Sequence, residues 1–171
     1  WLAGLFSLPH GTSGIITSGG SLGNMTALLT AKAQYLNNHP QTSLNKLALL
    51  VSEEAHYSVS RAIAILGIPA ENLIKVAVDD KFRMRTDLLE DYYNKISKEG
   101  KVVFCVVGSS CSTSSGSFDD LTSIAYFAKK HGIWFHVDAA HGGPAIFSKR
   151  YKSLLDGIDH ADSIVMDFHK M

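Results

Sequence analysis

The side chain best suited to take part in a reaction is a lysine near the end of the sequence. Residues 163–166 form a short apolar run that predicts a buried strand, and Asp167, His169 and Lys170 follow it. Open α/β sheets bind ligands just beyond the carboxyl ends of their strands. A lysine in such a place either reaches solvent or serves as an amine nucleophile.

A second candidate is the aspartate within "WFHVDAAHGG", residues 134–143. Side chains alternate between the faces of an extended strand, so Trp134, His136 and Asp138 share one face. Asp138 ends this mostly apolar strand and needs a partner, because burial of an unpaired carboxylate is costly. A structural arginine, a metal ion or a protonated ring nitrogen would each serve as that partner.

The metal alternative uses three residues. His136, Asp138 and the distant His169 are similar to a two-histidine-one-carboxylate iron site. That chemistry usually lies on antiparallel β-barrels, however, and a metal explains neither a Gly/Ser-rich loop nor Lys170. We therefore predict no metal site.

The Gly/Ser-rich loop is "TSGGSLGNMTALL", residues 17–29. Gly19 and Gly20 allow the backbone to approach an anion closely, and a hydroxyl of Ser18 or Ser21 adds a donor. The N–H groups at the start of a helix carry partial positive charge, so this loop predicts a phosphate site. It is not a P-loop, since no Gly-Lys-Ser/Thr follows. The alternative is a turn with an ordinary serine N-cap.

Two further loops carry polar side chains after predicted strands. His56 begins an amphipathic helix, where its imidazole either stacks on a planar ligand or merely caps the helix. The loop "GSSCSTSSGSFDD", residues 108–120, is dense in hydroxyl groups. Asp119 has a role in a site, or else Asp119 or Asp120 caps the next helix.

Alternating elements must position these loops. Apolar runs rich in β-branched residues predict strands at 46–52, 72–78, 101–108, 132–138 and 162–167. Helical patterns occupy residues 22–36, 57–66, 86–97 and 121–130. Thr86 would cap the third of these helices. This alternation predicts an α/β fold with a mostly parallel sheet and helices on both faces. No repeat or linker divides the chain.

Composition narrows the class of protein. The 171 residues, 46% of them hydrophobic, suit one globular domain, and 16 basic residues balance 16 acidic ones, which argues against nucleic-acid binding. No apolar run approaches the roughly 20 residues of a membrane span. Cys105 and Cys111 do not suggest a disulfide framework, so we expect a cytoplasmic setting. The chain begins and ends without a closing element, and we expect it to be a piece of a longer polypeptide.

One ligand accounts for all of these loops. A planar, phosphorylated pyridine aldehyde needs a helix N-terminus for its phosphate and a carboxylate for its pyridinium nitrogen. Its ring needs a flat or apolar sandwich, and its aldehyde needs a lysine amine. Each of these groups lies in a predicted strand-end loop.

On these motifs the chain resembles the pyridoxal-phosphate-dependent group II amino acid decarboxylases, the glutamate, aromatic-amino-acid and diaminobutyrate decarboxylase family. The likeness runs from about residue 14 to 171, and its most specific part is "HVDAAHGG" followed by "ADSIVMDFHKM". It implies that Lys170 binds the cofactor covalently and that His169 reaches the phosphate region. It also implies that Asp138 pairs with the pyridine nitrogen and that Ala140 packs under the ring.

Other roles follow from the same resemblance. The stretch "AHYSVSRA" matches the family's H-x-S-x-x-[KR]-A, so His56 would stack on the other face of the ring and donate a proton after decarboxylation. "SGGSLGN" corresponds to the phosphate loop of Gly19, Gly20 and Ser21. Thr113 falls where the family has a threonine near cofactor and substrate.

The resemblance also implies a fold and an activity. The fold would be the large domain of the aspartate-aminotransferase-like fold type I enzymes, and residues 1–171 would lack the N-terminal segment and the small C-terminal domain. We expect a homodimeric decarboxylase of L-2,4-diaminobutyrate, aspartate or glutamate, and an inactive isolated fragment. No nucleic-acid or membrane partner is expected.

Two departures and three rivals accompany this prediction. The family often has Asn-Pro-His-Lys where this chain has residues 167–170, and its Gly-Thr-Thr is Cys111-Ser112-Thr113 here. The carboxylate of Asp167 would repel a phosphate unless it faces away. The nearest rival is another fold type I enzyme, such as an aminotransferase, cysteine desulfurase or carbon–carbon lyase. The metal enzyme and a non-catalytic phosphate-binding module are the other two.

Overall fold

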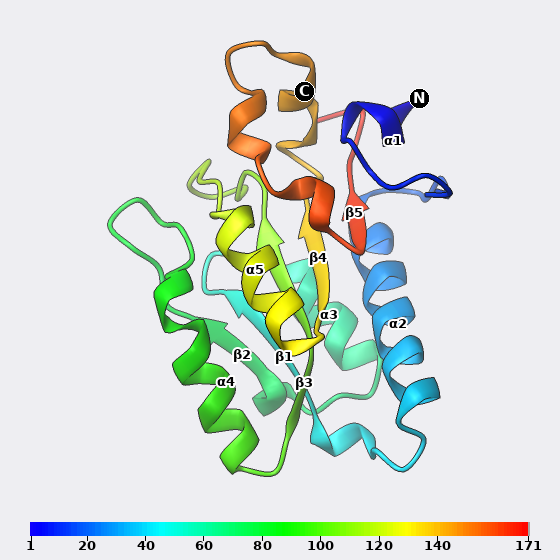
Figure 1. Cartoon of the computed structure of the whole chain (residues 1–171), viewed down its shortest axis with the longest axis vertical. Coiled ribbons are helices and arrows are strands. Elements are labelled where there is room, and N and C mark those ends of the chain that lie inside the picture. Colours follow the sequence, from blue (N-terminus) through cyan, green and yellow to red (C-terminus); the bar gives the residue numbers. More distant parts are fainter. Residues whose placement is uncertain (171) are drawn as a thin grey trace.

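Five parallel strands form one sheet in the computed structural model, which describes residues 1–170. The order across the sheet is β2-β1-β3-β4-β5, with all four neighbouring pairs parallel (Figure 1). The strands are β1 (Leu47–Ser52), β2 (Leu73–Val76), β3 (Val102–Ser109), β4 (Trp134–Asp138) and β5 (Ser163–Val165). The five predicted strands are confirmed, with bounds that differ by at most two residues at either end.

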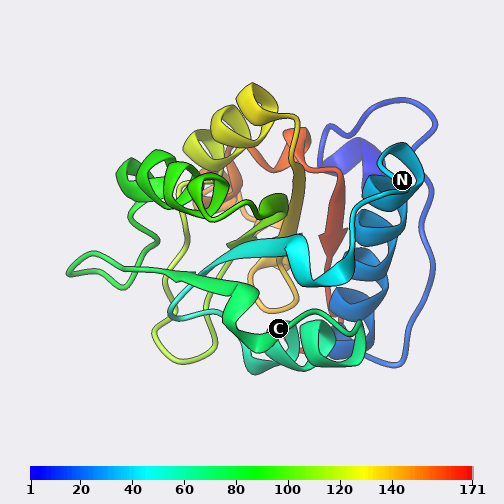
Figure 2. The ribbon, with the colours of Figure 1, turned by 90° about the horizontal axis from the view of Figure 1, so that it is seen from below.

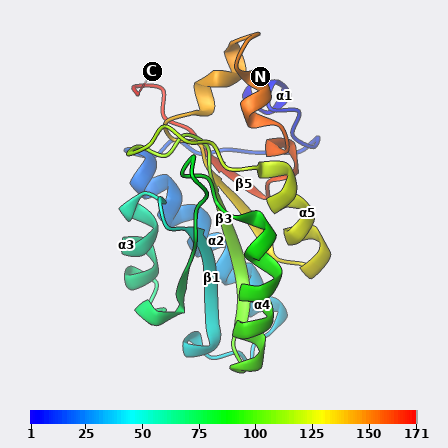
Figure 3. The same cartoon turned by 90° about the vertical axis from the view of Figure 1, so that its left-hand side faces the viewer.

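Helices cover both faces of the sheet. They are α1 (Leu2–Leu5), α2 (Gly20–Asn38), α3 (Tyr57–Ile65), α4 (Leu89–Lys98) and α5 (Leu121–His131). Six short 3₁₀ turns join them: η1 (Leu44–Lys46), η2 (Ala70–Asn72), η3 (Thr86–Leu88), η4 (Gly143–Phe147), η5 (Lys152–Leu155) and η6 (Ile158–His160). In Figure 3, α3 and α2 lie on one side of the sheet and α4 and α5 on the other, and Figure 2 shows the same layers from below.

Strand alternation builds the two cores. In β1, Ala48 and Leu50 pack into the core under α4 and α5, whereas Leu47, Leu49 and Val51 pack into the core under α2 and α3. All five side chains are at most 1% exposed. A strand buried on both faces reads as one continuous apolar run, which is why the sequence marked it so clearly.

Two helix starts differ from the prediction. Helix α2 begins at Gly20 with Gly19 as its N-cap, and no serine side chain caps it, so the ordinary serine cap is wrong. Thr86 does not cap a helix either, because it lies inside η3 and α4 begins only at Leu89. The Asp120 cap of α5 is confirmed, since its carboxylate accepts the Ser123 N–H at 3.0 Å.

The strand order reverses between β1 and β3. From β1 the chain moves outward to β2, then returns past β1 to β3 and continues through β4 to β5. Ligands of open α/β sheets bind at the carboxyl ends of strands where such a reversal opens a crevice. The fold therefore places a site at the ends of β1, β3, β4 and β5.

Candidate active site

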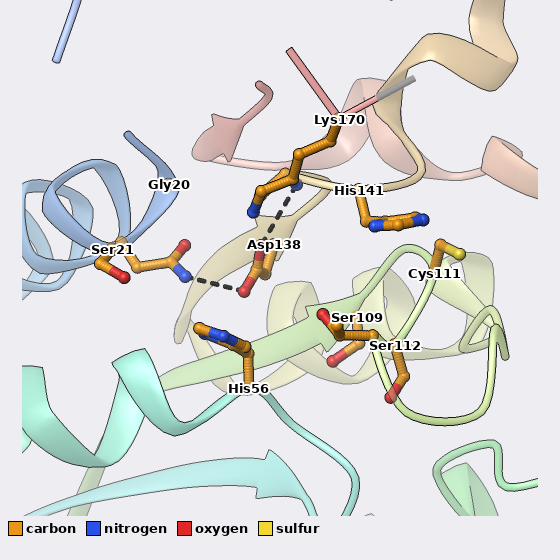
Figure 4. A pocket seen from close by; sticks show the side chains of 12 residues that line it. Gly20, Ser21, His56, Ser109, Cys111, Ser112, Asp138, His141 and Lys170 are labelled. Atoms are coloured by element: carbon orange, nitrogen blue, oxygen red, sulfur yellow. Dashed lines mark hydrogen bonds between the residues drawn. The ribbon is translucent and has the colours of Figure 1, made fainter. Parts of the chain in front are cut away.

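A pocket lies at this reversal, and residues from five segments line it (Figure 4). Seven of the predicted site residues are among them: Gly20, Ser21, His56, Thr113, Asp138, Ala140 and Lys170. In Figure 4, Lys170, Asp138 and His56 point toward one space, with Ser21 on one side and Cys111 and His141 on the other. The sheet thus brings together residues that lie far apart in the sequence.

The remaining two predicted residues are next to pocket residues in the sequence but do not line the pocket. Gly19 is the N-cap of α2, directly before Gly20. The side chain of His169 is 70% exposed, and its Nε2 lies 3.9 Å from Asp167 Oδ2. His169 directly precedes Lys170 but does not line the pocket among the described residues.

The start of α2 is shaped for close approach. A Cβ on Gly20 would lie 2.9 Å from both Ala140 Cβ and Asp167 Oδ2, so no larger residue fits there without displacement. Gly19 has φ of 147°, a conformation that L side chains rarely adopt. Glycine at these two positions leaves the helix start open to close approach by an anion. The Gly20 N–H is bonded to Asp167 Oδ2 at 3.2 Å.

A hydrogen-bonded network orients the aspartate and the histidine of the pocket. Asn24 in α2 is 1% exposed, and its Nδ2 donates to Asp138 Oδ2 at 2.7 Å and to Ser58 Oγ at 2.9 Å. Ser58 Oγ in turn lies 2.8 Å from His56 Nδ1, which also accepts the Ser58 N–H at 3.2 Å. The Ser58 hydroxyl therefore donates to Nδ1, which leaves the ring proton of His56 on Nε2. His56 therefore caps α3 and also lines the pocket.

The sequence analysis missed Asn24, which ties the two predicted residues together. A signal was present, because a helix residue on the same face as Ala27, Leu28 and Ala31 is expected to be apolar. A polar residue there must find buried partners. His141 and Ser109, which also line the pocket, had no comparable signal.

Replacement of Asn24 by alanine is expected to lower the free energy of unfolding by about 2–4 kcal/mol. The change leaves Asp138, Ser58 and His136 with unsatisfied buried groups. Urea denaturation measures the effect, with Asn37→Ala, an exposed residue of the same helix, as the matched control. Equal stability of the two variants would show that the network does not hold the site.

His136 belongs to this network and not to a metal site. Its Nε2 donates to Asn24 Oδ1 at 3.0 Å, and its Nδ1 lies 2.9 Å from Ser163 Oγ. Both ring nitrogens are thus engaged, and the side chain is fully buried. Within residues 1–170, no three His, Cys, Asp or Glu side chains gather closely enough to hold a metal ion.

Burial lowers the pKa of His136 below its usual 6.5, and the nearby Asp138 only partly opposes this effect. The unfolded chain takes up a proton at His136 as the pH falls through about 6.5, whereas the folded chain resists it. The stability that His136 contributes is therefore present above about pH 6.5 and is lost as the pH falls through the lower folded-state pKa.

This linkage predicts a pH slope in the free energy of unfolding between about pH 7.5 and 5.5. His136→Gln, which does not titrate, should flatten the slope in urea denaturation series. His10→Gln, at an exposed histidine, should leave it unchanged. A slope that survives His136→Gln would contradict a neutral, buried His136.

Asp119 is structural. Its carboxylate accepts the backbone N–H groups of Met84 and Ser109, each at 2.7 Å, and burial raises the pKa of Asp119. It fixes the loop after β3 to the turn that precedes η3. Asp119 does not line the pocket, so a direct site role for it is wrong.

The fold and the pocket define a class of protein, a parallel α/β domain with a lysine, a carboxylate and a helix N-terminus at the strand ends. The whole chain, residues 1–171, matches the family described as pyridoxal-dependent decarboxylase conserved domain. The chain belongs to this family.

Curated relatives agree with this assignment. The chain is 42% identical over 161 residues to an acidic amino acid decarboxylase of Xenopus tropicalis, covering 92% of this chain and 32% of that protein. It is 38% identical over 170 residues to the L-2,4-diaminobutyrate decarboxylase of Rhizobium meliloti, covering 99% of this chain and 33% of that protein. The chain thus spans about a third of the length of these relatives.

Solved structures share the fold. A crystal structure of mouse CSAD matches 99% of this chain and 36% of that chain, with a TM-score of 0.93 and 38% identity. The crystal structure of the glutamate decarboxylase domain of a Vibrio parahaemolyticus protein matches 99% of this chain and 39% of that chain, with a TM-score of 0.95 and 32% identity. The predicted fold type I architecture is confirmed.

The residues present fit pyridoxal phosphate, the cofactor of this family. Gly20 leaves a cradle at the start of α2 that a Cβ would fill. The Asp138 carboxylate, the Lys170 amine and the His56 ring supply the three other kinds of contact within the same pocket.

No helix within residues 1–170 has both the length and the apolar character needed to cross a bilayer.

Proposed function

We propose that the protein containing this chain is a pyridoxal-phosphate-dependent decarboxylase, which releases the α-carboxylate of an L-amino acid as carbon dioxide. The observation that carries the proposal is the convergence of Lys170, Asp138, His56 and the start of α2 in one pocket. When bound, the cofactor supplies a protonated ring that accepts the electron pair released at Cα.

The side chains of this chain would divide the work among them. Lys170 would hold the cofactor covalently through Nζ. Asp138, fixed by the Asn24 amide at 2.7 Å, would accept a hydrogen bond from the pyridinium nitrogen and keep its proton in place. His56 and Ala140 would sandwich the ring. His56, with its proton on Nε2, would return a proton to Cα.

The phosphate would lie at the helix start and the substrate at the opposite end. Gly19, Gly20 and Ser21 would offer N–H and hydroxyl donors to the phosphate, with His169 at its edge. Thr113, in the loop after β3, would lie near cofactor and substrate. The protein would orient the bond to the carboxylate perpendicular to the ring, the geometry in which that bond breaks most readily.

We propose L-2,4-diaminobutyrate, aspartate or glutamate as the substrate. The support is the relatives, which include an acidic amino acid decarboxylase and L-2,4-diaminobutyrate decarboxylases. We further propose that the full-length protein is a cytoplasmic homodimer and that residues 1–171 alone are inactive, because the chain spans only about a third of those relatives.

The test uses the full-length protein purified with pyridoxal phosphate. Borohydride treatment followed by peptide mapping should place a reduced pyridoxyl group on Lys170, and labelled carbon dioxide should be released from one of the three amino acids. Amino transfer to a 2-oxo acid without carbon dioxide release would favour an aminotransferase. An unmodified Lys170 would exclude the proposal.

A further inference from the structure

Asp167 lies where the sequence departs from the family pattern, and its carboxylate does not face away from the phosphate loop. The residue is 7% exposed and follows β5 by two positions. Its Oδ2 accepts the backbone N–H of Gly20 at 3.2 Å and lies 2.9 Å from Lys170 Nζ. A single oxygen therefore touches both the first turn of α2 and the lysine amine.

These two contacts are the ones that the cofactor itself would need. The N–H at the start of α2 would bind the phosphate, and the Lys170 amine would bind the aldehyde. The single N–H of Gly20 cannot donate a full-strength hydrogen bond to the Asp167 carboxylate and to a phosphate at the same time. Two anions held a few ångströms apart also repel strongly where water is partly excluded.

The other charged groups near Asp167 do not change this conflict. Besides Lys170, the charged neighbour on the same segment is His169, whose Nε2 lies 3.9 Å away and whose ring is mostly in solvent. From α2 the carboxylate accepts a backbone N–H, that of Gly20. On the side of the segment after β4, the backbone N–H of Asp167 donates to Ala140 O at 3.3 Å, and Ala140 carries no charge. Lys170 is thus its main counter-charge among the described residues.

We propose that Asp167 is a positioning residue that occupies the phosphate site of the cofactor-free protein and holds the Lys170 ammonium beside it. Cofactor loading then requires the carboxylate to give up the Gly20 N–H to the incoming phosphate. Asp167 thereby sets the rate and affinity of loading. This inference rests on the proposed function, because it takes the start of α2 as the phosphate site.

The test measures cofactor association with the cofactor-free full-length protein by stopped-flow absorbance. Asp167→Asn keeps the size of the side chain but removes its charge. We expect pyridoxal phosphate to associate about tenfold faster, and to bind correspondingly tighter, in this variant. Pyridoxal, which lacks the phosphate, should change by less than about twofold. Asp156→Asn, at an exposed aspartate with the same charge change, should leave both rates unchanged.

Inorganic phosphate gives a second readout that needs no covalent step. It should slow the association of pyridoxal phosphate at about tenfold lower concentration in Asp167→Asn than in the unaltered protein. If that variant does not fold, Asp167→Ser removes the same charge with a smaller side chain and should show the same contrast.

The outcomes separate this inference from the proposed function. Unchanged association of both aldehydes in the variants would overturn the inference, as would equal acceleration of both, since Asp167 would then act only through Lys170. In either case, a borohydride-reduced pyridoxyl group on Lys170 would leave the proposed function intact. Absence of that group from every protein would overturn both proposals.

Discussion

Replacement of Lys170 by alanine is expected to abolish covalent attachment of pyridoxal phosphate and to lower kcat by more than roughly 1,000-fold. The amine is the nucleophile that would bind the aldehyde, and no other lysine lines the pocket within residues 1–170. Visible absorbance and borohydride mapping measure attachment, and carbon dioxide release measures kcat. The phosphate contacts remain, so noncovalent cofactor binding should persist.

Lys170→Arg separates the chemistry of the amine from its charge. A guanidinium keeps the positive charge opposite Asp167, which lies 2.9 Å from Nζ, but it is not a nucleophile at neutral pH. Both variants should therefore be equally inactive, whereas Lys152→Ala, at an exposed lysine of η5, should retain full activity. A covalent pyridoxyl group in either Lys170 variant would contradict the assignment.

The elements of the fold were predictable because their patterns are strong. Strands such as β1 are buried on both faces and appear as unbroken apolar runs. Their carboxyl ends carry the polar residues, so the sequence also indicated Asp138 and Lys170. Helix starts were less predictable: α2 begins with a glycine N-cap and α4 follows a 3₁₀ turn, and neither uses the side-chain cap that sequence rules rely on.

Contacts between distant segments were the part that sequence could not supply. Asn24 meets Asp138 across 114 positions, and the Gly20 N–H meets Asp167 across 147. Alternation along β4 predicted that His136 and Asp138 share a face, but not that one asparagine from α2 would bind both. The sequence likewise left the orientation of Asp167 open. That orientation depends on the packing of α2 against β5, which no local pattern records.

Replacement of Asp138 by asparagine is expected to lower kcat by roughly 100- to 10,000-fold while leaving most of the covalent attachment to Lys170 intact. A neutral amide cannot hold the pyridinium nitrogen in its protonated form, so the ring becomes a weaker acceptor of the electron pair from Cα. Attachment depends instead on the lysine amine. Steady-state carbon dioxide release and the absorbance of the bound cofactor measure the two effects separately.

The structure makes this substitution a clean test, because the new side chain has the same shape. The substitution gives up the 3.2 Å hydrogen bond that Asp138 Oδ1 accepts from the Ala140 N–H. The new amide oxygen can still accept from Asn24 Nδ2, which donates to Asp138 Oδ2 at 2.7 Å in the unaltered chain. The fold should therefore survive, and Asp80→Asn, at an exposed aspartate, controls for the change in net charge. If Asp138→Asn kept its kcat, the ring would accept the electron pair from Cα without the help of a charged carboxylate at the end of β4. A large loss of kcat with attachment retained would support the placement of the protonated ring nitrogen against Asp138.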